Sequence, residues 1–172
     1  LKHSEIFQPE FFDRPFQGIA FQNKVFYCTK DGIVETPPLP EHRLRVSLPY
    51  HYDPRVKPVK WLKLLNEVFE PDSDCAEKIN AFQEFLGISL IGRMTQYPKC
   101  AIFVGNGANG KSTLIDIISL LVDQEGIASV PPQKWEDEYY TAMLDGKLLN
   151  LVSELPETNI LHSEKFKSII AG

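Results

Sequence analysis

The sequence predicts an α/β fold in which a mainly parallel sheet follows a small helical segment and a β-rich N-terminal tract. Three patterns support this prediction. Apolar and polar residues alternate before residue 50, apolar residues recur at helical spacing between residues 59 and 90, and short β-prone runs alternate with a helical pattern after Pro98. Strands that alternate with helices along a chain form a parallel sheet with helices on its faces.

The β-rich tract covers residues 1–57. Residues 18–21 and 25–27 are strand candidates, and Lys30-Asp31-Gly32 has the composition of a turn. Prolines at positions 37, 38 and 40 exclude a helix from the loop that follows. Over residues 43–48 leucine and valine alternate with arginine and serine, which predicts a half-buried strand. Because the chain does not begin with methionine, we expect this tract to be the tail of an upstream domain.

Two amphipathic helices are expected in the helical segment, residues 58–95. The first has apolar residues at helical spacing over 59–69, and Pro71 closes it. Asp74 followed by Glu77 resembles a capping box, which predicts that a second helix begins there. The apolar stripe of this second helix is expected in the core and not at a ligand surface: Ile79, Phe82, Leu86 and Leu90.

Residues 96–172 contain the alternating strands and helices. The run Cys100–Val104 is short, apolar and β-prone, so we expect a strand that is buried on both faces. A helix is expected at 112–122, a second strand at 127–130 and a third strand at 147–152. This order predicts the parallel sheet.

A glycine-rich sequence lies between the first of these strands and the first helix. It reads Gly105-Asn106-Gly107-Ala108-Asn109-Gly110-Lys111-Ser112, a complete GxxxxGK[ST] phosphate-binding loop. Glycines let backbone N–H groups approach phosphate oxygens, and the helix start directs its positive dipole at the same anion. Lys111 would then contact the β- and γ-phosphates of ATP, and the Ser112 hydroxyl would ligate Mg²⁺. The motif predicts a P-loop NTPase core; the alternative is a glycine-rich turn with an incidental lysine.

An ATPase also needs an acidic group at the end of a neighbouring strand, to hold the metal or to activate the attacking water. Glu154 follows the apolar run 148–152 and is our candidate for both roles. Glu157 takes its place if the strand ends three residues later.

Composition and charge limit the partners and the cellular compartment that the sequence allows. The formal net charge of −5 argues against a surface that wraps DNA by bulk attraction, although it permits a local basic groove. The cysteines at positions 28, 75 and 100 have no CxxC spacing, which excludes a disulfide framework or a zinc site of that type and favours a reducing compartment. No apolar run is long enough to cross a bilayer. We therefore expect a cytoplasmic protein with no membrane span.

Three motifs in this order resemble the superfamily 3 helicase domain of primase-helicase proteins from phages, plasmids and large DNA viruses: GNGANGKST, LNLVSELPE and SEKFKSIIAG. Upstream, LPYHYDPRVKPVKWLKLLNEVF and AEKINAFQEFLGISLIG resemble the segment that joins the primase and helicase parts of those proteins. The resemblance covers the chain from about Gly18 onward.

This resemblance implies an AAA+-like ATPase that assembles as a ring, usually a hexamer, and uses ATP and Mg²⁺ to translocate on single-stranded DNA. By this resemblance Thr113 is a further nucleotide-binding residue. Glu154 belongs to the family's acidic motif, and Lys167 to the motif that follows it. The chain has Ser153-Glu154 where many relatives have two adjacent acidic residues. The family's DNA-binding hairpin, γ-phosphate sensor and arginine finger are expected beyond Gly172, so residues 96–172 would be the N-terminal part of a helicase domain.

Two other functions use the same loop. A small-molecule or nucleotide kinase would carry an arginine-rich lid, whereas Arg93 is the only arginine after Gly92. A nucleotide-binding assembly module would not need an acidic residue at the position of Glu154.

Overall fold

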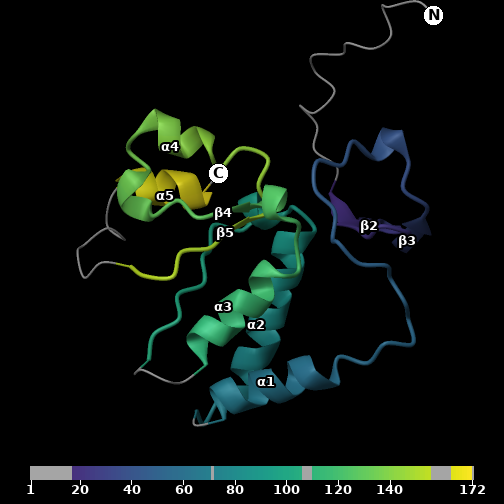
Figure 1. The fold of residues 1–172 in the computed structure, drawn as a ribbon, viewed down its shortest axis with the longest axis horizontal. Helices are drawn as coiled ribbons and strands as arrows, with labels where there is room; N and C mark the ends of the chain where they lie inside the picture. The colour runs from purple at the N-terminus through teal and green to yellow at the C-terminus, as the bar shows by residue number, and fades with distance from the viewer. Residues whose placement is uncertain (1–16, 71, 106–109, 156–163, 172) are drawn as a thin grey trace, which may run out of the picture.

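The computed structural model describes residues 17–70, 72–105, 110–155 and 164–171 (Figure 1). Within these ranges the chain forms an antiparallel sheet, a short parallel sheet and helices that pack around them. None of the described helices is long and apolar enough to cross a bilayer.

The antiparallel sheet consists of β1 (Gly18–Ala20), β2 (Val25–Thr29) and β3 (Gly32–Thr36), in the order β1-β2-β3. The strands predicted at 18–21 and 25–27 are confirmed, and β2 continues beyond its predicted end. No sequence pattern predicted β3. Gly32 has a φ of 130°, a conformation that glycine adopts easily in a tight turn. The Thr29 hydroxyl donates a hydrogen bond to the carbonyl oxygen of Gly32 (3.1 Å).

The strand predicted over residues 43–48 does not form, and this prediction is wrong. The 3₁₀ helix η2 (Pro40–His42) ends at Arg43, whose φ of 50° lies in the left-handed region. The chain therefore leaves the direction of the sheet, and Leu48 N–H donates a hydrogen bond to the Ala20 carbonyl oxygen of β1 (2.7 Å). Burial does not alternate along this segment either: Arg45 is exposed and Leu48 is buried, but the other residues of 43–48 are all partly buried.

Helices α1 (Val59–Phe69) and α2 (Cys75–Leu90) form as predicted and contact each other. Leu65 of α1 is fully buried. The ring centroid of Phe82 on α2 lies 6.2 Å from that of Trp61 and 6.4 Å from that of Phe69. The predicted apolar stripe of α2 is confirmed, with Ile79, Phe82 and Leu86 buried and Leu90 partly buried.

The capping box predicted at the start of α2 does not form. Asp74 is the N-cap residue, but its side chain makes no capping hydrogen bond. Its carboxylate instead pairs with Lys78 (2.9 Å), which also pairs with Asp72 (2.8 Å). The hydrogen bond from Lys78 lowers the pKa of Asp74, and the hydrogen bond to Asp72 raises the pKa of Lys78. Asp74 therefore contributes an ion pair, and no capping hydrogen bond, at the start of α2.

The second half of the chain contains α3 (Lys111–Ser119), β4 (Ile127–Ala128), α4 (Glu138–Ala142), β5 (Leu149–Asn150) and α5 (Glu164–Ala171), with the 3₁₀ helices η3 (Met94–Gln96), η4 (Gln124–Gly126) and η5 (Pro132–Lys134). β4 and β5 pair in parallel, with Ile127 opposite Leu149. The two later strands are therefore confirmed in position, although each is shorter than predicted. In Figure 1 the antiparallel sheet lies to one side of α1, α2 and α3.

The strand predicted at Cys100–Val104 does not form. Phe103 enters the core, with its ring centroid 5.5 Å from that of Phe82, but Val104 is 90% exposed. Among the described residues, no backbone hydrogen bond joins this segment to β4 or β5. A strand needs a hydrogen-bonded neighbour, and the segment has none in this part of the chain. The described parallel sheet is thus smaller than predicted.

Two clusters of buried side chains hold these elements together. The main cluster joins residues of α1, α2, α3 and β5 with Leu48 of the N-terminal tract. The second contains Ala128, Val130 and Trp135. Trp135 donates its indole N–H to the Val130 carbonyl oxygen (3.1 Å) and stacks on Phe166 of α5, at 5.4 Å between ring centroids. Each cluster therefore includes segments that are distant in the sequence.

Gly126 has no room for a side chain, because a Cβ at this position would lie 2.4 Å from methyl groups of both Val46 and Val122. We expect Gly126→Ala to lower the free energy of unfolding by about 1–3 kcal/mol through overpacking. Gly87 is the control: it lies within α2 with nothing within 4 Å of the added Cβ. Gly87→Ala should raise the free energy of unfolding by about 0.5–1 kcal/mol, since alanine favours the helix. Urea unfolding measures both changes, and equal effects would contradict the packing at Gly126.

Candidate nucleotide-binding site

The described end of the glycine-rich loop is the start of α3. Gly110 is the N-cap residue and has φ 80° and ψ 0°, a left-handed conformation that disfavours other residues. Its carbonyl oxygen accepts the first hydrogen bond of the helix, from Leu114 N–H (2.9 Å). Among the described residues no side chain caps this end, and the first turn has no acidic residue. The first N–H groups of a helix have no partner within the helix and can bind an anion.

The Lys111 side chain reaches the first residue of the motif. Its Nζ donates a hydrogen bond to the Gly105 carbonyl oxygen (2.8 Å), which brings together the two ends of the motif. An ammonium group has three N–H donors, so Lys111 can keep this carbonyl and still donate to a phosphate oxygen. Ser112 and Thr113 follow in the first turn with exposed side chains. Three of the predicted ligand residues are thus adjacent at the start of α3.

The middle of the loop, Asn106-Gly107-Ala108-Asn109, lies outside the described residues, as does Glu157. Their predicted roles therefore remain predictions.

The core fixes the direction of α3. Leu114 is fully buried and Ile118 nearly so, both in the main cluster with residues of α1 and α2. A contact at the loop itself comes from α1: a Cβ on Gly110 would lie 2.8 Å from Cγ2 of Val68. No sequence signal marks Val68 as part of the site, because its position at helical spacing indicates only a core residue.

Glu154 lies past the end of β5. The backbone pairing continues to Leu151, whose N–H donates to the Ala128 carbonyl oxygen (2.8 Å), and Glu154 follows with an exposed side chain. Within the described chain no hydrogen bond or ion pair joins Glu154 to Lys111 or Ser112. The predicted acid therefore follows a strand, and no described hydrogen bond or ion pair links it to the start of α3.

Lys167 lies on α5 and is exposed, whereas the neighbouring Phe166 packs on Trp135. The packing of Phe166 fixes the face of α5 that is buried. Lys167 is consequently on the part of α5 that a further molecule or segment can reach.

The described residues contain no group of three His, Cys, Asp or Glu side chains that could hold a metal ion. Mg²⁺ does not require such a group, because it keeps several waters and takes one or two protein ligands together with phosphate oxygens. The Ser112 hydroxyl and the Glu154 carboxylate are the kinds of oxygen that this ion uses. The residues fit Mg²⁺ as a partner of a bound polyphosphate, and not as a metal held by the protein alone.

Comparison with protein families gives one match. A model described as a family of unknown function, DUF5906, matches residues 103–172. The matched range begins before the glycine-rich loop and includes Glu154 and α5. No curated protein and no solved structure matches the chain.

The junction between Val68 and Gly110 leads to a prediction. Gly110→Ala should weaken binding of inorganic pyrophosphate by at least ~10-fold, since a left-handed alanine costs about 1–2 kcal/mol and its Cβ would also displace Val68. Adding Val68→Ala should recover part of the affinity by removing the steric contact. Calorimetric titration measures both, with Gly87→Ala as a glycine control distant from the loop. Unchanged affinity in Gly110→Ala would contradict a role for this junction.

Proposed function

We propose that this chain is part of an ATP-driven DNA helicase of the superfamily 3 type, in which residues 96–172 bind the nucleotide. The observation that carries the proposal is the junction at Gly110 and Lys111. There a left-handed glycine opens a core-anchored helix, and the lysine that follows donates a hydrogen bond to the Gly105 carbonyl oxygen at the other end of the motif. The GxxxxGK[ST] motif before a helix is the signature of a loop that binds phosphate groups through its backbone N–H groups.

In this proposal each residue type has a separate task. Lys111 offsets the charge on the β- and γ-phosphates with its ammonium group, and backbone N–H groups at the start of α3 bind the same oxygens. Mg²⁺, bound through the Ser112 hydroxyl, would supply further neutralisation of the phosphate charge. Glu154 accepts a proton from the attacking water, either in the present arrangement or after Glu154 and the start of α3 have come closer together.

The resemblance to superfamily 3 helicases supports two partners for this reaction: further copies of the chain and single-stranded DNA. A ring of copies, a hexamer by analogy, would surround single-stranded DNA in the cytoplasm of the host cell. The net charge of −5 is compatible with this arrangement if the DNA-binding surface is local. We expect DNA affinity of the full-length protein to fall as salt rises, because phosphate contacts release counterions.

Lys111→Ala tests nucleotide binding. We expect the dissociation constant for Mg-ATP to rise by about 10–100-fold, the range for losing a charged hydrogen bond of about 1.5–3 kcal/mol. Lys99→Ala is the matched control, because Lys99 is an exposed lysine upstream of the loop. Titration of a fluorescent ATP analogue measures both variants. An unchanged dissociation constant in Lys111→Ala would show that the loop does not bind the nucleotide.

Glu154→Gln tests hydrolysis. In the full-length protein the variant should bind Mg-ATP normally and hydrolyse it at least ~100-fold more slowly, the usual scale for losing a general base. Glu157→Gln is the comparison: if it alone slows hydrolysis, the base is three residues further along.

The response to DNA separates the helicase from the other users of this loop. Single-stranded DNA should stimulate ATP turnover by the full-length protein. Stimulation by a small-molecule acceptor instead would indicate a kinase, and indifference to both would indicate an assembly module.

A further inference from the structure

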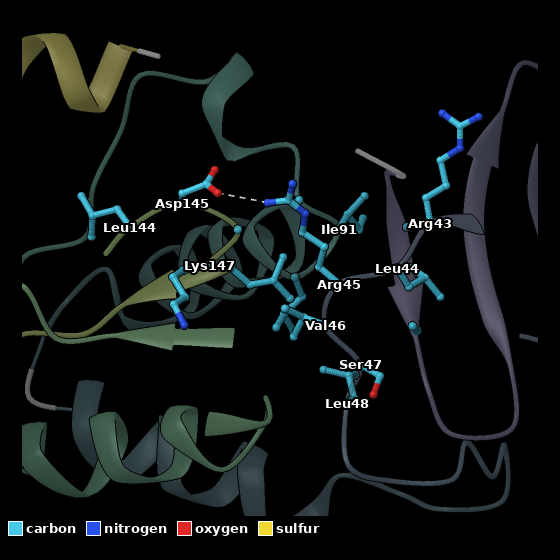
Figure 2. A pocket seen from close by; sticks show the side chains of 16 residues that line it. Arg43, Leu44, Arg45, Val46, Ser47, Leu48, Ile91, Leu144, Asp145 and Lys147 are labelled. Carbon is cyan, nitrogen blue, oxygen red and sulfur yellow. Dashed lines mark hydrogen bonds and ion pairs between the residues drawn. The ribbon is translucent and has the colours of Figure 1, made fainter. Parts of the chain in front are cut away.

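A cavity of about 550 Å³ lies away from the glycine-rich loop (Figure 2). It is enclosed by β1, the segment 43–48, the end of α2 and the loop 144–148. Its volume is in the range of pockets that hold small organic ligands. Neither the described loop residues nor Glu154 line it, so nothing in the proposed ATPase reaction uses this space.

Aliphatic side chains make up much of the lining of the cavity. Figure 2 shows side chains from three of the enclosing segments around it, including Leu44, Val46, Leu48, Ile91 and Leu144. No aromatic side chain is among the described residues that line it. A nucleobase would find no ring to stack on, whereas a flexible hydrocarbon chain would gain free energy from contact with these methyl groups.

An ion pair between Arg45 and Asp145 lies at the edge of the cavity. Figure 2 shows the guanidinium of Arg45 directed at the carboxylate of Asp145, and the nearest N–O distance is 3.2 Å. Both side chains are accessible, with exposed fractions of 41% and 82%. Such an exposed pair contributes only about 0–1 kcal/mol. An anion with better geometry can therefore replace Asp145 at Arg45, because guanidinium binds carboxylate and phosphate groups through two hydrogen bonds.

The other basic side chains of the cavity point elsewhere. The Lys147 ammonium donates to the Glu125 carbonyl oxygen (2.7 Å), and Figure 2 shows the Arg43 guanidinium directed away from the Arg45–Asp145 pair. The Arg45 guanidinium also lies close to Gly146, where an added Cβ would be 3.0 Å from Nη1. The cavity thus has one oriented cationic group beside an apolar interior.

Backbone strain at the rim is a separate observation. Arg43 is the only non-glycine residue with a positive φ in the described chain, and a left-handed arginine costs about 1–2 kcal/mol. The buried His42 holds this turn: its Nδ1 accepts from Leu39 N–H (3.1 Å), and its Nε2 is hydrogen-bonded to the Thr36 hydroxyl (3.2 Å). Strain that the surrounding structure maintains is concentrated at ligand-binding sites. Here it directs residues 44–48 along the cavity.

We propose that this cavity binds an aliphatic organic anion, with the hydrocarbon chain among the leucine and valine side chains and the carboxylate or phosphate on Arg45. The site is independent of the proposed ATPase.

Calorimetric titration with octanoate and octyl phosphate tests the site and distinguishes its two headgroups. We expect at least one of the two to bind. Arg45→Gln should weaken that binding by about 10–100-fold, because it removes a charged hydrogen bond. Asp145→Asn should tighten it by about 2–5-fold, because the competing carboxylate is gone. Non-specific adsorption would not respond to Asp145→Asn in this way.

Three controls make the test specific. Arg55→Gln and Asp53→Asn alter another exposed Arg–Asp pair, with a nearest N–O distance of 2.8 Å, that does not line the cavity, and they should leave the affinity unchanged. Lys111→Ala should also leave it unchanged, which separates this site from the glycine-rich loop. Octanol supplies the chain without the charge and should bind at least ~10-fold more weakly. The proposal is overturned if neither anion binds, if octanol binds as well as the anions, or if Arg45→Gln and Arg55→Gln behave alike.

Discussion

The position of α3 depends on two buried side chains. Leu114 and Ile118 fix the helix against α1 and α2, and this packing determines where the first turn of α3 ends up. In this turn the Ser112 side chain is exposed, Lys111 is partly exposed, and Gly110 lies close to Val68. A shift of α3 along its axis would remove this contact and the bond between Lys111 and Gly105 together. Core packing therefore fixes the position of the residues that we propose as nucleotide ligands.

The N-terminal tract is attached to this core by several different interactions. Leu48 is buried in the main cluster, the Ser47 hydroxyl lies within hydrogen-bond distance of Asp123 (3.4 Å), and the Tyr50 hydroxyl donates to the Leu120 carbonyl oxygen (2.6 Å). The last two contacts are made at the C-terminal end of α3 and just after it. The tract therefore contacts the end of α3 that is opposite the glycine-rich loop. Its docking and the loop are connected through one short helix.

Local patterns in the sequence predict local structure well. The two helices at 59–69 and 75–90 form because their apolar spacing needs only one face to pack. The strand expected at 43–48 fails because the backbone at Arg43 is set by His42, whose partners on Thr36 and Leu39 no alternation pattern reveals. The strand expected at Cys100–Val104 fails for another reason: it needs a neighbour that the sequence pattern does not supply. At the candidate site the motif predicts Gly110 and Lys111, whereas the contact from Val68 is tertiary and has no sequence signal.

The two core clusters have an experimental consequence, because each contains one of the two tryptophans of the chain. Trp61 packs near Phe82, between α1 and α2. Trp135 stacks on Phe166 with an interplanar angle of 13° and has its indole N–H bonded to a carbonyl oxygen. Release of α5 would expose the second indole to water and leave the first unchanged. A chain with phenylalanine in place of either tryptophan would thus carry an intrinsic optical reporter for one half of the molecule, without any added label.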